Sequence, residues 1–119
     1  MFSLDNTMRY WLYNKPVNMR MGFNGLSGIV NNSIGMSMRS GDVFVLVNAA
    51  RNRMKILHRE EGGLVLYALR IEMGRMRMPF SGEPDEIASS FGHADLISAA
   101  QSAMESPYVR RMKMLSKSL

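Results

Sequence analysis

The sequence predicts a small α+β domain in which one helix packs on a mostly antiparallel sheet of four to five strands. Two patterns indicate this fold class. Short segments with alternating or continuous apolar residues, typical of strands, follow one another between residues 9 and 78. A single stretch with the apolar spacing of a helix lies among them, at residues 18–34. With 119 residues, 46% of them apolar, the chain is long enough to bury a core without disulfides or metals.

The first part of this domain is expected to contain one strand and the helix. Arg9–Tyr13 is rich in aromatic residues, which favour strands, and Asn14-Lys15-Pro16 is a turn sequence. Asn18 is a residue type that caps helices, so we expect the helix to begin there. The apolar stripe of the helix consists of Met19, Phe23, Leu26, Val30 and Ile34.

Three glycines recur beside this stripe, at Gly22, Gly25 and Gly28. Each glycine costs a helix about 1 kcal/mol relative to alanine. We therefore expect the glycine side of the helix to pack closely against the sheet, where a short backbone distance would offset that cost. The glycines do not form a phosphate-binding loop, because no strand leads directly into them and no Gly-Lys-Ser/Thr follows.

Four more strands are expected after a loop over residues 31–41. Asp42–Val47 is a continuous apolar run, which is typical of a central strand. After a turn, residues 53–59 alternate between apolar and polar side chains. A Glu-Glu-Gly-Gly hairpin connection precedes the strand at residues 64–71, and a last alternating strand is expected at residues 74–78.

The remaining chain differs in pattern, so we divide the protein into an α+β domain at residues 1–79 and a helical, partly flexible C-terminal extension at residues 80–119. Pro84 stands among acidic residues, as at the start of a helix, where negative charge is favourable. An imperfect apolar stripe runs from Ile87 to Met104.

The net charge of +5 is distributed unevenly along the chain. Residues 1–79 contain 11 Lys/Arg and 5 Asp/Glu, whereas residues 80–109 contain 5 Asp/Glu and no Lys or Arg. The last ten residues add 4 cations. This pattern predicts a basic binding body, an acidic segment that could fold back over it, and a basic tail. The alternative is a basic protein with an ordinary solvated C-terminal helix.

The chain has no cysteine, which excludes disulfides and thiolate metal sites and fits a reducing compartment. The first ten residues lack the basic and apolar regions of a signal peptide. Wholly apolar runs such as residues 43–47 are too short to span a bilayer. We therefore expect a cytoplasmic protein with no membrane partner.

Basic residues on the predicted strands are the candidates for binding nucleic acid. On the strand at residues 53–59 they alternate with apolar residues and so share one sheet face. Cations on one face suit DNA phosphates, and the sequence holds no recognition helix or zinc finger for reading bases. The alternative is a solvated face that discourages edge pairing. The candidate residues are Arg51, Arg53, Lys55, Arg59, Arg70, Arg75 and Arg77.

Two further groups of residues bear on possible partners. Aromatic residues could stack on the bases of a single strand, the candidates being Tyr10, Trp11, Tyr13 and Tyr67. Methionine occupies 13 positions, and this adaptable side chain either fills the core or lines a surface for another protein. The methionines considered for such a surface are Met36, Met38, Met73, Met76 and Met78.

No set of residues points to catalysis, a metal or a cofactor. His58 and His93 lie 35 residues apart with no metal-binding motif around either one. A nuclease needs carboxylates that together hold two metal ions, whereas Asp42 and Glu72 stand alone at the ends of predicted strands. We therefore expect a protein that is not an enzyme.

Several motifs in collinear order resemble one family. The motifs are P-x-D-M-R-x-G-F-D-G-L, S-G-x-V-F-V-F-x-N, R-x-R-x-K-x-L and Y-x-R-L-E-x-G-x-F-x-x-P. They are similar to those of the TnpB-like accessory proteins (second open reading frame) of insertion-sequence family sixty-six. The matching residues are Pro16, Met19, Arg20, Gly22, Phe23, Gly25, Leu26, Ser40, Gly41, Asp42, Val43, Phe44, Val45, Asn48, Asn52, Arg53, Lys55, Ile56, Leu57, Tyr67, Arg70, Ile71, Glu72, Gly74 and Pro79.

The chain departs from the family pattern at three positions near the helix. Asn18 and Asn24 replace two acids, and Met21 replaces a basic residue. The resemblance implies a bacterial accessory protein of a mobile element, encoded beside a separate transposase and assisting transposition without catalytic activity. Two molecular roles stay open. The protein binds DNA through non-specific phosphate contacts, or it is a protein–protein adaptor to the transposase or a sister accessory protein without direct DNA contact.

Overall fold

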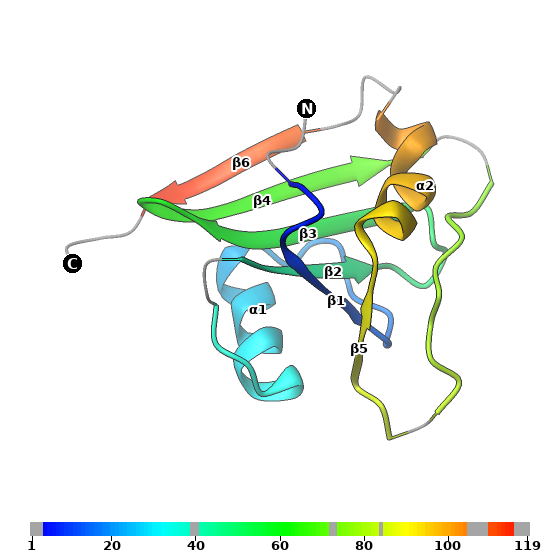
Figure 1. Ribbon diagram of the computed structural model, residues 1–119, viewed down its shortest axis with the longest axis horizontal. Helices are drawn as coiled ribbons and strands as arrows, with labels where there is room; N and C mark the ends of the chain where they lie inside the picture. The colour runs from blue at the N-terminus through cyan, green and yellow to red at the C-terminus, as the bar shows by residue number, and fades with distance from the viewer. Residues whose placement is uncertain (1–3, 39–40, 72–73, 84, 105–109, 116–119) are drawn as a thin grey trace.

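The fold is an α+β arrangement built around one six-stranded sheet in the order β5-β1-β2-β3-β4-β6 (Figure 1). The computed structural model of the chain describes residues 4–38, 41–71, 74–83, 85–104 and 110–115, and at residues 91, 100–104 and 110–115 it describes the backbone alone. The elements are β1 Arg9–Tyr13, α1 Phe23–Gly28, η1 Ile29–Ile34, β2 Asp42–Val47, β3 Arg53–Glu60, β4 Gly63–Arg70, β5 Ala88–Phe91, α2 His93–Met104 and β6 Arg110–Leu115.

The sheet is mostly antiparallel, as predicted, with one parallel pair. β1 and β2 run parallel, and the other four neighbouring pairs are antiparallel. A parallel pair needs a crossover connection, which the segment carrying α1 and the π-helical turn η1 provides. The predicted α+β class is therefore confirmed, with six strands in place of four or five.

The four strands with the strongest apolar patterns form where the sequence predicts them. β1 and β2 have the predicted bounds, and β3 and β4 differ from prediction by one residue. The strand predicted at residues 74–78 is wrong. This segment is not part of the sheet.

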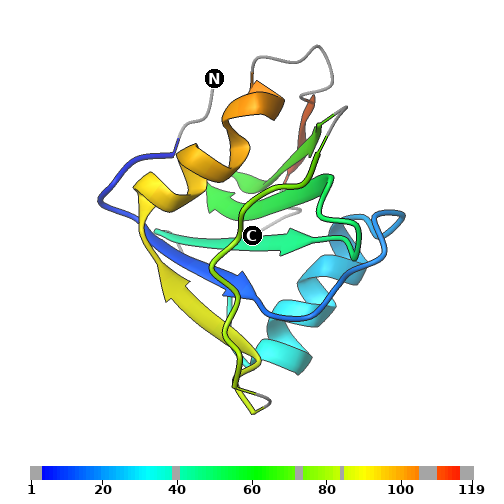
Figure 2. The ribbon, with the colours of Figure 1, turned by 90° about the vertical axis from the view of Figure 1, so that its right-hand side faces the viewer.

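Each face of the sheet buries an apolar core under one helix, and Figure 2 shows α1 and α2 on opposite sides of the sheet. In the α2-side core, Leu96 of α2 packs over residues such as Val45, Ile56 and Tyr67, all of them fully buried. In the α1-side core, Leu26 packs over a different set of side chains, among them Val30, Phe44, Leu46, Leu57 and Leu66. Full burial of each such side chain stabilises the fold by about 1.5–3 kcal/mol.

The helix after β1 differs from the prediction in its start and in its glycine side. It begins at Phe23, because Asn18 instead closes a turn by accepting the N–H of Arg20 at 2.9 Å. The apolar stripe does face the sheet, but the glycines do not. A Cβ on Gly28 would lie 4.0 Å from the Asn32 amide, and the atoms nearest to one on Gly25 would be those of the Met21 side chain, at 3.3 Å. The predicted close approach to the sheet is therefore wrong.

The C-terminal third adds to both edges of the same sheet. β5 pairs with β1 and β6 pairs with β4, two strands that the sequence did not predict. α2 is a helix within the extension predicted to be helical, and its Leu96 lies in the α2-side core. The predicted helix start at Pro84 lies outside the described residues. Whether residues 1–79 fold alone stays a prediction.

Candidate nucleic-acid interface

The turn between β2 and β3 is built by the side chain of Asn48. Its Oδ1 accepts the N–H of Asn52 at 3.1 Å and of Arg53 at 3.0 Å, and its Nδ2 donates to Asn52 Oδ1 at 2.7 Å. Arg51 takes the tight position of this turn with φ of 56°, in the left-handed region that few non-glycine residues adopt. The turn thus holds Arg51 at a fixed place between the two strands and Arg53 at the first position of β3.

The segment that follows β4 runs beside this turn and brings more arginines to it. Ile71 N–H donates to Asn52 O at 2.9 Å, and Met76 N–H donates to Arg51 O at 2.7 Å. Met76 is buried in the α2-side core, whereas its neighbours Arg75 and Arg77 are exposed. The alternating pattern at residues 74–78, which predicted a strand, therefore comes from one buried methionine between two exposed arginines.

Two hollows open at this end of the sheet, the end that faces the viewer in Figure 2. The first hollow, of about 640 Å³, lies between the turn, residues 75–79 and α2. The second hollow, of about 320 Å³, lies beside it. The first is lined by Arg51, Arg75, Met76, Arg77, Met78, Pro79, Asp95 and Ser98, and the second by Asn52, Arg53, Arg70 and Ile71. We call the five arginines of the two hollows, which are Arg51, Arg53, Arg70, Arg75 and Arg77, the arginine end.

The arginine end concentrates positive charge that is only partly compensated. Arg53 and Arg70 stand directly opposite each other in the β3–β4 ladder, a placement in which like charges repel. The Arg51 guanidinium lies over the Phe80 ring, 4.8 Å from its centroid, which fixes its direction. No carboxylate among the described residues is within ion-pair distance of four of these side chains, namely Arg51, Arg53, Arg75 and Arg77.

Lys55 and Arg59, the two other predicted binding residues, lie elsewhere. They share a sheet face with Leu57, as the alternation predicts, but α1 and the segment after it cover that face. Lys55 Nζ donates to Met21 O at 2.7 Å, and Arg59 Nε donates to Met38 O at 3.2 Å. These two cations thus hydrogen-bond the covering segment, residues 21–38, to the sheet.

Most of the aromatic residues considered for stacking on bases are buried. Tyr67 is fully buried, and Tyr10 and Tyr13 are 2% and 8% exposed. The Tyr10 hydroxyl donates to the Asp5 carbonyl, and burial raises the pKa of Tyr10 to about 12. Trp11 is half-buried against the α1-side core. These rings stabilise the fold, and the three tyrosines have no open face for a base.

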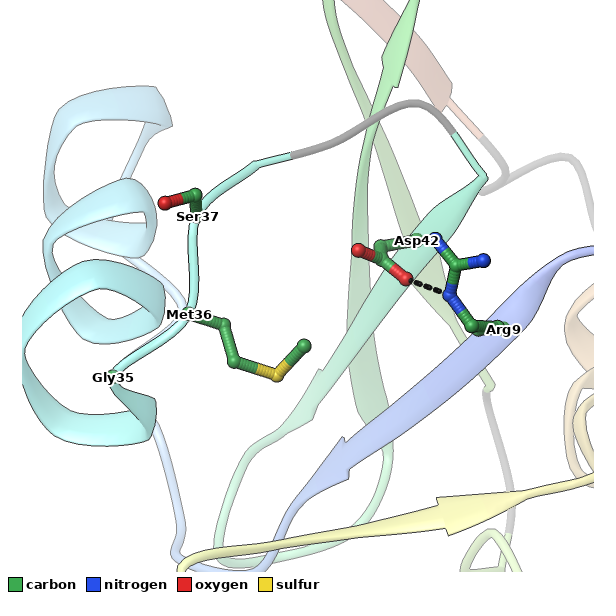
Figure 3. Close-up of a pocket in the computed structure, with 5 residues that line it drawn as sticks. All are labelled: Arg9, Gly35, Met36, Ser37 and Asp42. Carbon is green, nitrogen blue, oxygen red and sulfur yellow. Dashed lines mark hydrogen bonds and ion pairs between the residues drawn. The ribbon is translucent and has the colours of Figure 1, made fainter.

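A third hollow, of about 450 Å³, contains Asp42, the carboxylate considered above as a catalytic candidate (Figure 3). Asp42 is 3% exposed, and Arg9 Nε donates to its Oδ1 at 2.6 Å, a hydrogen bond that raises the pKa of Arg9. The described residues contain no group of three His, Cys, Asp or Glu side chains that could hold a metal. Glu72 lies outside the described residues.

The two histidines pack against tyrosines and do not meet. His58 is buried, with its ring stacked on Tyr67 at 5.9 Å between centroids and its Nε2 3.9 Å from Glu60 Oε1. The ring centroids of His93 and Tyr10 lie 5.6 Å apart.

No helix in the described part of the chain has the length and apolar character needed to cross a bilayer.

The sequence did not identify two residues that lie beside the arginines. Asp95 lines the first hollow from the first turn of α2, and the Phe80 ring packs against the Arg51 guanidinium. An acidic residue in a first helical turn is a recognisable sequence signal, but its arginine neighbours are distant in the chain. The cation–π contact has no sequence signal.

Comparison with known proteins matches the chain to a family model. No curated protein and no solved structure matches the chain. The family model described as IS66 Orf2 like protein matches residues 8–99, a span that includes β1 to β5, the β2–β3 turn and the residues that line both hollows. Because this span covers most of the 119 residues, the chain belongs to the IS66 Orf2 like protein family.

Proposed function

We propose that this protein is a non-catalytic accessory factor of insertion-sequence transposition that binds DNA phosphates through the arginine end. One observation carries the proposal. Five arginines from the β2–β3 turn, β3, β4 and the segment after β4 gather at one end of the sheet. Arginine donates paired hydrogen bonds that match phosphate oxygens. An anion that lies between Arg53 and Arg70, which stand opposite each other, would also offset the repulsion between these two positive charges.

The contacts are expected to position DNA without reading its sequence. The arginines lie on a turn and on strand ends, and the described helices present no basic face that could enter the major groove. Affinity then comes mainly from counterion release, so it falls steeply with salt. Such a factor acts in the cytoplasm, where it can hold the ends of the element for a separate transposase.

The proposal includes no chemical step. Asp42 is engaged by Arg9 and lies at the end of the sheet opposite the arginine end, since β1 and β2 begin there. Phosphodiester cleavage needs carboxylates that hold metal ions at the scissile phosphate. With magnesium or manganese, the purified protein should leave DNA that carries the ends of the element uncut. Cleavage lost in Asp42→Asn with folding intact would overturn the non-catalytic assignment.

The test of DNA binding is a salt titration followed by fluorescence anisotropy. With a duplex of about 20 base pairs, four phosphate contacts give a log–log slope of roughly −3 to −4 between about 50 and 200 mM salt. Equal affinity for unrelated sequences is expected. Absence of binding at the lowest salt would refute the proposal.

A second candidate role, as an adaptor to the transposase or a sister accessory protein, is favoured by the uncharged segment that contains α1, η1 and the loop after them. Residues 21–38 contain no charged side chain, although 21% of the chain is charged. Several of them are exposed, and interface centres are depleted in charged residues. If this role is the main one, the transposase should co-purify with the protein at high salt and DNA affinity should be negligible. The exposed residues of this segment are Gly22, Asn24, Asn31, Asn32, Ser33, Gly35 and Ser37.

A further inference from the structure

The side chains of the first hollow form two walls that differ in hydrogen-bonding character. Arg75 and Arg77, from the segment after β4, and Arg51, from the β2–β3 turn, offer only donors. Asp95 and Ser98 stand one turn apart on α2, so they share one face of that helix, and both have oxygens that accept hydrogen bonds. A bare phosphate would use the donors alone. The acceptor wall therefore indicates a ligand that carries N–H groups as well as phosphate.

Asp95 is held in place with one carboxylate oxygen left for such a ligand. Its Oδ2 accepts the Gly92 N–H at 3.1 Å, and its own N–H donates to Gly92 O at 3.1 Å. Among the described residues, none donates a hydrogen bond to Oδ1. Oδ1 can therefore accept a hydrogen bond from a group that enters the hollow.

The Arg51 guanidinium offers a flat surface for a base. It lies over the Phe80 ring, 4.8 Å from the centroid, and it lines the hollow, whereas Phe80 does not. The ring thus supports the guanidinium from outside the hollow. Bases of single strands stack on supported guanidinium planes as they do on aromatic rings. Arg51 can provide the stacking surface that the buried tyrosines cannot.

The backbone of Arg51 points to a role for its side chain. Its φ of 56° lies in the left-handed region, where glycine is more stable than arginine. Arginine therefore adds nothing to the turn that glycine would not, and residues held in such conformations gather at functional sites.

The size and the apolar part of the hollow suit a nucleotide. Its volume of about 640 Å³ falls within the range of about 300–1,000 Å³ that is typical of small-molecule sites. Met76, Met78 and Pro79 line it as well, and the sugar and the edges of a base can bury apolar surface against them.

We propose that the first hollow binds one unpaired nucleotide of a DNA strand and prefers a base with an exocyclic amino group, such as cytosine, over thymine. This inference rests on the proposed function. The base stacks on Arg51, its amino group donates to Asp95, and the neighbouring phosphates accept from Arg75 and Arg77. Thymine carries an oxygen where cytosine carries the amino group, and a carboxylate repels that oxygen. Base pairing occupies these groups in a duplex, so equal affinity for unrelated duplexes is still expected.

The experiment measures the affinity of the full chain for three labelled strands of about 12 nucleotides by fluorescence anisotropy. The strands are oligodeoxycytidine, oligothymidine and a strand of abasic sites. Their phosphate charge is equal, so counterion release contributes equally and the differences come from the bases. The wild-type protein is expected to bind oligodeoxycytidine about fivefold more tightly than oligothymidine and about 20-fold more tightly than the abasic strand.

Asp95→Asn tests the selection between the two bases. An amide can accept from cytosine and donate to thymine, so the ratio of the two Kd values should fall to within about twofold of one. Asparagine also keeps an oxygen for the Gly92 N–H, so α2 should stay folded, which circular dichroism can check. The matched control is Asp85→Asn, at an exposed acid that does not line the hollow. It changes the net charge equally and should preserve the preference for cytosine.

Arg51→Gly tests the stacking surface. Glycine adopts the φ of this position without strain, so the turn should keep its shape. The preference for oligodeoxycytidine over the abasic strand should fall about fivefold. Arg20→Ala removes an exposed arginine that does not line the hollow and should leave that preference unchanged.

The outcomes separate this inference from the proposed function. If the protein binds neither the duplex nor any strand, both fail. If it binds the duplex with the expected salt slope but binds the three strands equally, the inference alone fails. An equal loss of base preference in Asp85→Asn would also overturn it, because the effect would then come from net charge. Deoxycytidine monophosphate should compete only weakly, since it lacks a second phosphate contact. Competition as strong as that of the strand would assign the hollow to a free nucleotide and overturn its assignment to DNA.

Discussion

The basic residues of β3 lie in two contrasting regions of the molecule. Lys55 and Arg59 lie under the segment that covers one face of the sheet, and each donates to a backbone carbonyl of that segment. Arg53, on the same strand and the same face, lies at the end of the sheet, where the cover stops and Arg70 stands opposite. The difference in surroundings comes from position along the strand and not from residue type.

This contrast separates cations that stabilise the fold from cations that can bind a ligand. A charged donor on a carbonyl stabilises a fold by about 1.5–3 kcal/mol. An exposed arginine with no such partner contributes little to stability and keeps its donors for an anion. Substitutions in the two regions should therefore affect different measurements.

The largest effect is expected at the arginine end. Changing Arg53, Arg75 and Arg77 together to Ala should weaken duplex binding about 100-fold at low salt and flatten the log–log salt slope by about 2–3. The melting temperature should stay close to that of the wild-type protein, because these side chains are exposed. Anisotropy titrations at several salt concentrations measure both quantities.

The control for this variant is Arg20→Ala. Arg20 is exposed and lines neither hollow, so its loss should leave the affinity within about twofold. If Arg20→Ala weakens binding as much per charge as the triple variant does, the arginine end has no special role and the protein binds through its net charge.

Lys55→Ala is expected to lower stability and leave DNA affinity nearly unchanged, the reverse of the triple arginine variant. It leaves the Met21 carbonyl without its charged donor, so the free energy of unfolding should fall by about 1.5–3 kcal/mol. Duplex affinity of the folded protein should change by less than about twofold. Urea denaturation measures the free energy of unfolding, and anisotropy on the same preparation measures the duplex affinity. A stable Lys55→Ala protein with strongly reduced DNA affinity would show that Lys55 belongs with the binding residues.

The first four strands could be predicted from sequence because their signals are local. Apolar runs and alternation depend on each residue's immediate neighbours, and they place β1 and β2 at the observed bounds. The same signal fails at residues 74–78. Met76 is buried and Arg75 and Arg77 are exposed, but no neighbouring strand completes a ladder with this segment. Alternation predicts an extended backbone, whereas a strand also requires a partner that local sequence does not specify.

The candidate site was predicted in part, for a related reason. All five residues of the arginine end were among the predicted basic residues, and alternation correctly placed Arg53, Lys55 and Arg59 on one face. Which part of that face is covered depends on how far α1 and the following segment extend over the sheet. That is a tertiary property. The same holds for Asp95, whose approach to the arginines depends on where α2 packs.

Asn48→Ala is expected to change both stability and DNA affinity. This residue holds the β2–β3 turn together and thereby also positions two of the binding residues. Its side chain makes three hydrogen bonds within the turn that carries Arg51 and Arg53. Their loss should lower the free energy of unfolding by about 1–2 kcal/mol. DNA affinity should fall about threefold, because the arginines lose their fixed placement. Asn31→Ala, at an exposed position of η1, is the matched control and should alter neither value.

The smallest expected effect is a gain in stability on the outer side of the helix. Gly28 has helical φ and ψ of −61° and −40°, and the space around its missing side chain is open apart from the Asn32 amide at 4.0 Å. Gly28→Ala should therefore raise the free energy of unfolding by about 0.5–1 kcal/mol, because alanine loses less backbone entropy in a helix. DNA affinity should be unchanged, since α1 lies away from the arginine end. A loss of stability would mean that the backbone at Gly28 has a close neighbour after all. Unchanged stability with weaker binding to a transposase would assign the glycines to a partner surface and favour the adaptor role.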